Sequence, residues 1–371
     1  MRQFVFVLTI CSVVFCLTFN STAQTPAALA QSKPAAPANG PADPKAKKTF
    51  DEASKFMQEQ HWVFALDGFR KADKQDGGHC IPCEYQAWKA AVELGDFKAA
   101  RTQAELMLAQ VTSPVDKATA QFLLGRTYLA EGIHDKHDGP IALAETAFNE
   151  ALQLRPRNAN YLYSDATALA YLKRDDAARS RFQDFLKVAS RDDLDYARAQ
   201  RFVERPELAR AKMAPNFRLT TLDGRSLTLE SLSGKVVLID FWATWCAPCR
   251  EALPHIRQIA RKFDGQPLAV LSISLDSDEA KWKDFVGKNG MTWMQYRDGG
   301  FDGRISKLFD VTAIPATFTI DADGVLEDQH VGDADMEGKL KKLLAGAMEA
   351  ANRKAAANGP VPKEKTASGS E

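Results

Sequence analysis

The first half of the chain alternates apolar and polar residues with the period of an amphipathic helix. Its clearest segments carry alanines followed about four residues later by another alanine or a large apolar residue, which is the spacing of one helix face. These segments are WVFALDGFRKAD (62–73), DFKAARTQAELML (96–108), PIALAETAFNEAL (140–152) and DDAARSRFQDFLKV (175–188). Another periodic segment precedes each of them. The pattern predicts an all-α domain of paired helices over residues 49–205.

These helices recur at a regular interval. Ala65 and Ala99 are 34 residues apart, and so are Ala144 and Ala178. The middle interval is about ten residues longer, and the polar segment EGIHDKHDGP (131–140) predicts a loop insertion there. Paired helices with this period resemble tetratricopeptide repeats, although the Trp and Pro positions of that family are only partly present. The resemblance implies a concave face that binds a protein partner, and a generic helical bundle is the alternative.

The pattern changes near Met213, from the helical period to short runs typical of strands. VVLIDFW (236–242) and LAVLSISLD (268–276) are almost continuously apolar, as expected for strands buried in a parallel sheet. Helical segments follow both of them. ATFTID and VLEDQHVG then flank the turn ADG (322–324) as a hairpin, and an amphipathic helix closes the domain. This order predicts an α/β domain over residues 213–349.

Two cysteines stand where the first of these strands meets the next helix, in WCAPC (245–249). Cys246 would lie at the helix N-terminus, where unpaired backbone N–H groups and the helix dipole stabilise a thiolate. Cys249 follows about one turn later, at the separation that a disulfide needs. Pro248 falls in the first turn, where a missing N–H is harmless. Because a thiolate is the nucleophile of thiol–disulfide exchange, this placement predicts a redox-active pair.

The segment GKVVLIDFWATWCAPC (234–249) resembles the thioredoxin superfamily, and with the preceding hairpin APNF…LDG it resembles the extracytoplasmic TlpA/ResA branch. Pro254 fits the proline that kinks the active-site helix of that family. The resemblance implies a thioredoxin fold without a cofactor and the activity of a thiol-disulfide oxidoreductase. It also implies the site residues: Cys246 as nucleophile, Cys249 as resolving cysteine, their redox-active disulfide, a cis-proline substrate loop at Pro315, and supporting positions at Trp245, Pro248 and Ile314.

Two positions depart from the pattern of the branch. Many members carry a glutamate three residues after the second cysteine, but here Ala252 stands there and the acid is next to it, at Glu251. One position along a helix is about 100° of rotation, so Glu251 is expected to face elsewhere. Conversely, Asp240 lies inside the apolar strand, where burial should raise its pKa. Asp240 is therefore a candidate acid–base for Cys249, and the alternative is a buried acid without a role in turnover.

A second pair, in GHCIPC (78–83), opens a predicted helix of the repeat domain. Four cysteines suit zinc, but the two pairs lie in separate predicted domains, so no metal site is expected. Haem attachment requires a histidine directly after the second cysteine, and Glu84 stands there. We expect Cys80 and Cys83 to form a local structural disulfide that fixes the start of the helix. A second redox pair that exchanges electrons with the thioredoxin-like domain, unpaired thiols and transient metal binding are the alternatives.

Composition and charge limit the classes of function. The 371 residues contain 48 Lys and Arg against 48 Asp and Glu, so no basic surplus favours nucleic acid. The N-terminus, MRQFVFVLTICSVVFCLTFNSTAQ, predicts a signal peptide over residues 1–23 and an extracytoplasmic or periplasmic protein, with an uncleaved membrane anchor as the alternative. Residues 24–48 are rich in Ala, Pro and Lys and predict a flexible linker, and residues 352–371 predict a disordered tail.

Together these features predict an exported thiol-disulfide oxidoreductase. Ala-Pro between the cysteines and Ile314 before the cis-proline resemble the reducing members of the family. A reductase in that compartment requires a membrane electron donor, and the resemblance implies oxidised exported proteins, for example apocytochromes, as substrates. One alternative is a scaffold in which the repeats bind a partner and the thioredoxin domain only docks. Another is a peroxiredoxin-like peroxidase, which the alanine at position 243 disfavours because that family requires threonine there.

Overall fold

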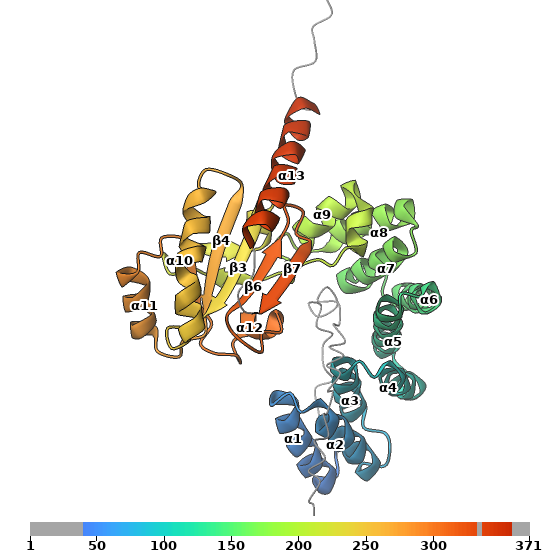
Figure 1. Ribbon diagram of the computed structural model, residues 1–371. Helices are drawn as coiled ribbons and strands as arrows, with labels where there is room; N and C mark the ends of the chain where they lie inside the picture. The colour runs from blue at the N-terminus through green and yellow to red at the C-terminus, as the bar shows by residue number, and fades with distance from the viewer. Residues whose placement is uncertain (1–39, 332–335, 358–371) are drawn as a thin grey trace, which may run out of the picture.

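The computed structural model describes residues 40–331 and 336–357, and the predicted signal peptide (1–23) lies outside them. A curved stack of helices forms the first part of the chain, and a sheet covered by helices forms the second (Figure 1). The predicted fold class, an all-α domain followed by a thioredoxin-like α/β domain, is confirmed. No helix in the described ranges combines the length and the apolar character that a membrane span requires.

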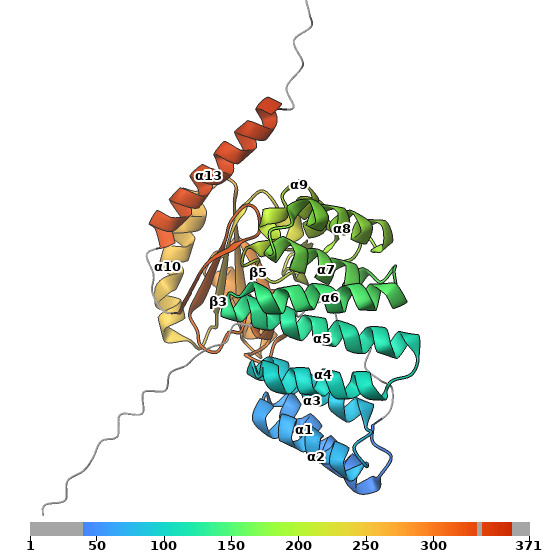
Figure 2. The same ribbon diagram turned by 90° about the vertical axis from the view of Figure 1, so that its right-hand side faces the viewer.

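The helical part contains nine α-helices within the described residues, and each packs against the next along the chain. They are α1 (Pro44–Gln58), α2 (Trp62–Gln75), α3 (Ile81–Leu94), α4 (Phe97–Gln110), α5 (Pro114–Asp135), α6 (Asp138–Leu154), α7 (Ala159–Tyr171), α8 (Asp175–Val188) and α9 (Tyr196–Glu204), followed by the 3₁₀ turn η2 (Pro206–Arg210). Figure 2 shows them stacked as a column, with α1 and α2 at one end and α8 and α9 at the other. We call this column the helical arm.

The four alanines that defined the sequence period lie on α2, α4, α6 and α8, the second helix of each pair. Ala65, Ala99, Ala144 and Ala178 are each at most 5% exposed. A small side chain at this position lets the facing helix approach closely, so the regular spacing reflects regular helix packing. The paired helices of the arm therefore fit the predicted repeats.

Two expectations about the arm are wrong. The segment 131–140 is not a loop insertion, because it lengthens two helices: α5 runs to Asp135 and α6 begins at Asp138. Gly132 lies inside α5, and a Cβ at this position would lie only 2.4 Å from Cγ1 of Ile141 on α6. Glycine therefore lets the two helices approach closely here, in spite of its low helix propensity. The predicted linker 24–48 is wrong for its last residues, and residues 24–39 lie outside the described ranges. Pro44 opens α1, and the Asp43 carboxylate accepts hydrogen bonds from the first free N–H groups of that helix.

The second part is built on a five-stranded sheet in the order β5-β4-β3-β6-β7, preceded by the small hairpin β1–β2. β3 pairs in parallel with β4 and antiparallel with β6. The elements are β1 (Arg218–Thr220), β2 (Ser226–Thr228), η3 (Glu230–Leu232), β3 (Val236–Trp242), α10 (Ala247–Lys262), β4 (Leu268–Ser274), α11 (Glu279–Lys288), β5 (Met294–Arg297), α12 (Arg304–Leu308), β6 (Ala316–Ile320), β7 (Leu326–Val331) and α13 (Met336–Ala357).

The central strand β3 is buried along its whole length, so both of its faces carry apolar side chains. Val236 and Leu238 pack with Ile256 and Ile259 of α10 and with apolar residues of α13. The alternate residues of β3 face the other layer, where Phe309 and Phe318 lie. Because α13 continues to Ala357, residues 352–357 are helical and the predicted disordered tail is wrong for them; residues 358–371 lie outside the described ranges.

Helix α9 fastens the arm to the thioredoxin-like domain through arginines on one face. Arg198 is 1% exposed, and its Nη2 donates to the Ala214 carbonyl at 2.7 Å and to Asn216 Oδ1 at 2.8 Å. Its guanidinium also lies 3.8 Å from Glu230 Oε1. One turn further on, Arg201 forms two hydrogen bonds with the same Glu230 carboxylate. The junction is therefore a buried, charged contact.

Candidate active site

The two cysteines of WCAPC form a disulfide at the start of α10. The distance between their Cα atoms is 5.3 Å. Cys246 is the N-cap of the helix, and its Sγ accepts the Cys249 backbone N–H at 3.2 Å. A cysteine at this position faces the unpaired N–H groups of the first turn, which stabilise a thiolate when the disulfide is reduced. The strand–helix junction thus supplies an activated sulfur.

The loop before β6 closes the site from the other side. The Ile314–Pro315 peptide bond is cis, and Cys246 Sγ lies 3.9 Å from the Ile314 carbonyl oxygen. Both cysteines are at most 6% exposed, whereas Trp245 beside them is 59% exposed. Pro248 in the first turn is also exposed. The cysteines, the supporting residues Trp245, Pro248 and Ile314, and Pro315 are therefore brought together at one edge of the domain.

Asp240 lies on β3, the strand that leads into this site, and is 7% exposed. It has the same parity on β3 as Val236 and Leu238, so its side chain faces the α10 layer. Cys249 is also buried on α10, where it belongs to the cluster that contains Phe241 and Trp242. Burial raises the pKa of Asp240 from its ordinary value to about 7, and a hydrogen bond from Ser272 opposes the shift. Glu251, in contrast, is exposed, as its helical position predicts.

A short hydrogen-bond chain holds the Asp240 carboxyl. Ser272 lies opposite it on β4 and donates its hydroxyl to Asp240 Oδ2 at 3.1 Å. The Trp293 indole N–H donates to the same Ser272 hydroxyl oxygen at 2.8 Å. Sequence reasoning missed both residues, although a serine in the otherwise apolar run LAVLSIS was a signal for Ser272. These two hydrogen bonds orient the Asp240 carboxyl. Among the described residues, no cation pairs with it and lowers its pKa.

Asp276 fixes the backbone just before the cysteines. It is 3% exposed and follows the end of β4. Its Oδ2 accepts the Thr244 backbone N–H at 3.0 Å, and its Oδ1 accepts the Thr244 hydroxyl at 2.6 Å. Sequence analysis did not single out this residue, because its role depends on the adjacency of β3 and β4. The loop that carries Trp245 and Cys246 is thereby anchored on the sheet.

The second pair, Cys80 and Cys83, forms its own disulfide in the helical arm. It packs with Ala72 and Phe50 in a small cluster separate from the core that contains Cys246. The structure therefore does not bring the two pairs together. In the described ranges, no group of three or more His, Cys, Asp or Glu side chains is arranged to hold a metal ion.

Comparison with known proteins finds similarity to redox proteins. A family model described as the AhpC/TSA family matches residues 211–329. The thiol-disulfide oxidoreductase ResA of Bacillus anthracis is 31% identical over 145 residues, which cover 38% of this chain and 83% of that protein. The thioredoxin-like protein YneN of Bacillus subtilis is 34% identical over 135 residues, which cover 35% of this chain and 77% of that protein. A solved thiol-disulfide oxidoreductase from Bacteroides fragilis is 28% identical and covers 36% of this chain and 99% of its own, with a TM-score of 0.34.

Proposed function

Because the chain belongs to the ResA family of thiol-disulfide oxidoreductases, we propose that it is exported and reduces disulfides of extracytoplasmic proteins through Cys246 and Cys249. The observation that carries this proposal is the position of Cys246 Sγ, at the N-terminus of α10 and 3.9 Å from the Ile314 carbonyl before cis-Pro315. An activated sulfur beside a partly exposed loop is the arrangement that a reductase needs in order to bind and attack a protein disulfide. Export rests on the predicted signal peptide (1–23), which lies outside the described residues.

The proposed reaction begins from the reduced pair. The Cys246 thiolate attacks one sulfur of the substrate disulfide, and the other substrate sulfur leaves with the electron pair of the broken bond. Cys249 then loses its proton to Asp240 and attacks Cys246 Sγ, which releases the second substrate sulfur. The substrate has gained two electrons, and the enzyme carries the 246–249 disulfide. A membrane electron donor must reduce this disulfide before the next cycle.

Asp240→Asn is expected to change both the rate and the stability with pH. The variant keeps an acceptor for Ser272 but cannot take a proton, so we expect slower exchange and loss of the rate change near pH 7. Since the native pKa of Asp240 is raised to about 7, the folded wild type binds more protons than the unfolded chain between about pH 4 and 7. Its stability therefore falls as pH rises through this range, by up to about 4 kcal/mol for this group.

The measurements are pH–rate profiles and urea unfolding of the oxidised protein at pH 5 and pH 8. The variant should lose less stability than the wild type over this interval, and Asp264→Asn, which changes an exposed carboxylate, should behave as the wild type does. An unchanged pH–rate profile in Asp240→Asn would remove the proposed acid–base role. The carboxyl would then be a buried acid without a part in turnover.

The direction of the reaction is tested by the reduction potential of the 246–249 pair. A reductase should have a value near that of thioredoxin, about −270 mV, because it must give electrons to its substrates. The measurement equilibrates the Cys80→Ser/Cys83→Ser variant with dithiothreitol redox buffers and follows the remaining pair. A value near about −120 mV would instead indicate an oxidant and overturn the proposed direction.

The helical arm supports a further part of the proposal, the recruitment of a partner protein. Oxidised exported proteins, for example apocytochromes, are the proposed substrates, and the ligand of the arm is a protein of unassigned identity. A scaffold without redox activity would not need the cysteine pair and the cis-proline loop in contact. A peroxidase is not supported, because Ala243 stands three residues before Cys246, where that chemistry requires a threonine.

A further inference from the structure

The disulfide of the arm repeats the local geometry of the disulfide in the thioredoxin-like domain. Cys80 is the N-cap of α3, and its Sγ accepts the Cys83 backbone N–H at 3.2 Å, the same distance as between Cys246 and Cys249. A proline occupies the first turn of the helix in both places. The free N–H groups of that turn stabilise a thiolate at the N-cap cysteine. Reduction of the Cys80–Cys83 bond is therefore favoured by the same local effect.

A buried carboxyl accompanies this pair, as Asp240 accompanies the other. Glu84 lies one residue beyond Cys83 and one turn beyond Cys80, and it is 0% exposed. Its Oε1 accepts a hydrogen bond from the Gln110 side chain at 2.6 Å. Its Oε2 has no hydrogen-bond partner within residues 40–331 and 336–357. A buried acceptor without a partner is costly, so a proton on this carboxyl, or a donor formed at the start of the same helix, would stabilise it.

The neighbouring helices give Glu84 no cation. Helix α2 contributes the Asp73 carboxylate, which accepts the Cys80 backbone N–H at 3.0 Å, and α4 contributes the neutral amide of Gln110. Burial raises the pKa of Glu84 to about 7, Gln110 opposes the shift, and Asp73 adds to it. A carboxyl in this setting is protonated near neutral pH and can give up its proton.

We propose that Cys80 and Cys83 form a second redox site of this chain, which takes two electrons from small thiols and uses Glu84 as its proton donor. A thiolate attacks Cys80 Sγ, the Cys80–Cys83 bond breaks, and Cys83 leaves with the electron pair and takes the proton of Glu84. A second thiolate attacks the mixed disulfide and releases the Cys80 thiolate at the helix N-terminus. Two thiols have become one disulfide, the pair has become a dithiol, and water returns the proton to Glu84.

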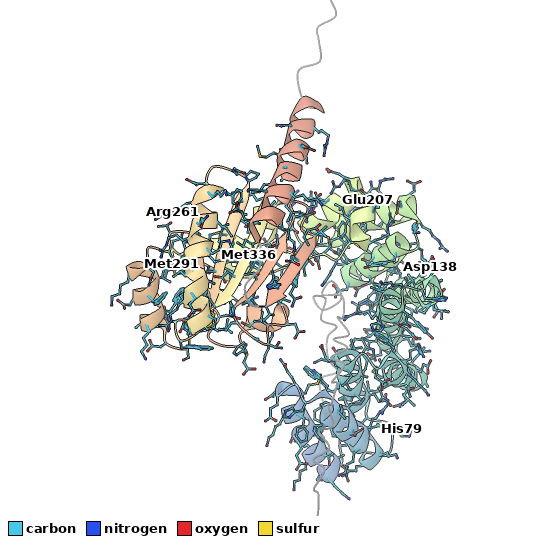
Figure 3. All side chains as sticks on the ribbon, viewed as in Figure 1. His79, Asp138, Glu207, Arg261, Met291 and Met336 are labelled. Atoms are coloured by element: carbon cyan, nitrogen blue, oxygen red, sulfur yellow. A yellow bond between two sulfur atoms is a disulfide. The ribbon has the colours of Figure 1, made fainter. Side chains whose placement is uncertain are left out.

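Two features indicate small thiols as the electron source. The only cis peptide bond of the described residues is Ile314–Pro315, so no cis-proline loop faces Cys80 to hold a protein strand. His79, directly before Cys80, is exposed and lies on the side of the arm turned away from the sheet (Figure 3). The pair does not contact Cys246 of the same chain, and it is buried, with Cys80 2% and Cys83 0% exposed. The 246–249 pair is buried to a similar degree, at 6% and 5%, so an electron donor for the pair of the arm has to be small.

The test uses the full chain with Cys246→Ser and Cys249→Ser, so that one disulfide remains in the described ranges. The protein is incubated in buffers of reduced and oxidised glutathione, quenched with acid, alkylated and analysed by mass spectrometry. Circular dichroism of the same samples reports folding. We expect at least half of the Cys80–Cys83 pairs to become reduced while the chain stays folded, and to reoxidise when oxidised glutathione is added. A pair that stays oxidised until urea unfolds the protein would overturn the proposal and leave a structural disulfide.

Glu84→Gln then tests the proton donor. In the parent, the rate constant of reduction, normalised to thiolate concentration, should fall as pH rises through about 7, because Glu84 loses its proton there. The variant should be about tenfold slower or more below pH 6 and should match the parent above pH 8. Glu93→Gln, which changes an exposed acid of the same helix, is the matched control and should keep the parent profile. A parental profile in folded Glu84→Gln would refute the role of Glu84.

Discussion

Replacing Cys246 with serine is expected to lower the rate of disulfide reduction about a thousandfold or more, because a hydroxyl at the helix N-cap does not ionise to a nucleophile at neutral pH. The readout is the reduction of insulin disulfides with dithiothreitol as electron source. The Cys80→Ser/Cys83→Ser variant is the matched control, since it removes the disulfide of the arm and leaves the 246–249 pair intact. Retention of most of the rate in Cys246→Ser would contradict the assignment.

In the companion variant Cys249→Ala, Cys246 should still attack the substrate disulfide, but no cysteine remains to release the substrate from the mixed disulfide. Cys246 would then stay bound to its substrate as a mixed disulfide, which non-reducing electrophoresis of cell-envelope extracts can detect. The adducts should disappear in the Cys246→Ser/Cys249→Ala double variant. If Cys249→Ala captures no protein while Cys246→Ser leaves the partners of the arm bound, a scaffold explains the chain better than a reductase.

Arg198→Met is expected to remove about 3–5 kcal/mol of stability from the full chain, because it leaves charges and acceptors buried at the junction without their partner. Asp195 would lose its cation, Glu230 would keep only Arg201, and the Ala214 carbonyl would lose its donor. Methionine fills a similar volume, so the loss reports the charge and hydrogen bonds more than a cavity. Urea unfolding, followed by far-UV circular dichroism and by tryptophan fluorescence, measures the effect.

The matched control for this variant is Arg205→Met, at the C-cap of the same helix. Arg205 pairs with Asp323 at 2.7 Å, but its side chain is 43% exposed, and exposed pairs contribute about 0–1 kcal/mol. The two optical signals should separate in Arg198→Met, since the helical arm and the thioredoxin-like domain would no longer unfold together. Equal losses of unfolding free energy in the two variants would show that the buried Arg198 contributes no more to stability than the exposed Arg205.

The catalytic cysteines were predictable because the features that make them reactive lie close together in the sequence. A buried strand, a helix start and two cysteines three residues apart fall within one short segment, and the backbone then fixes their separation. The raised pKa of Asp240 was predictable for the same reason, since a carboxyl in a continuously apolar strand must be buried. The partners of that carboxyl were not predictable, because Ser272 and Trp293 come from other segments that only the sheet order brings beside it.

Composition led to a wrong prediction of secondary structure where glycine is needed for close helix packing. The segment EGIHDKHDGP looks like a loop because it is polar and contains glycines, yet Gly132 is inside a helix that needs close contact with Ile141. A similar limit applied to Arg198. An arginine in a polar helix is usually exposed, and only the approach of Ala214, Asn216 and Glu230 from the next domain buries it.

The buried junction at Arg198 has a consequence for how a client would be presented to the sulfur. A protein held by a domain on a flexible tether samples many orientations, and its effective concentration at the active site depends on tether length. Here the arm and the sheet meet through a contact in which Arg198 is buried, which limits the range of distances between the arm and Cys246 compared with a flexible tether. A substrate protein bound to the arm would then be reduced efficiently only if its disulfide lies at a suitable distance from the segment that binds the arm.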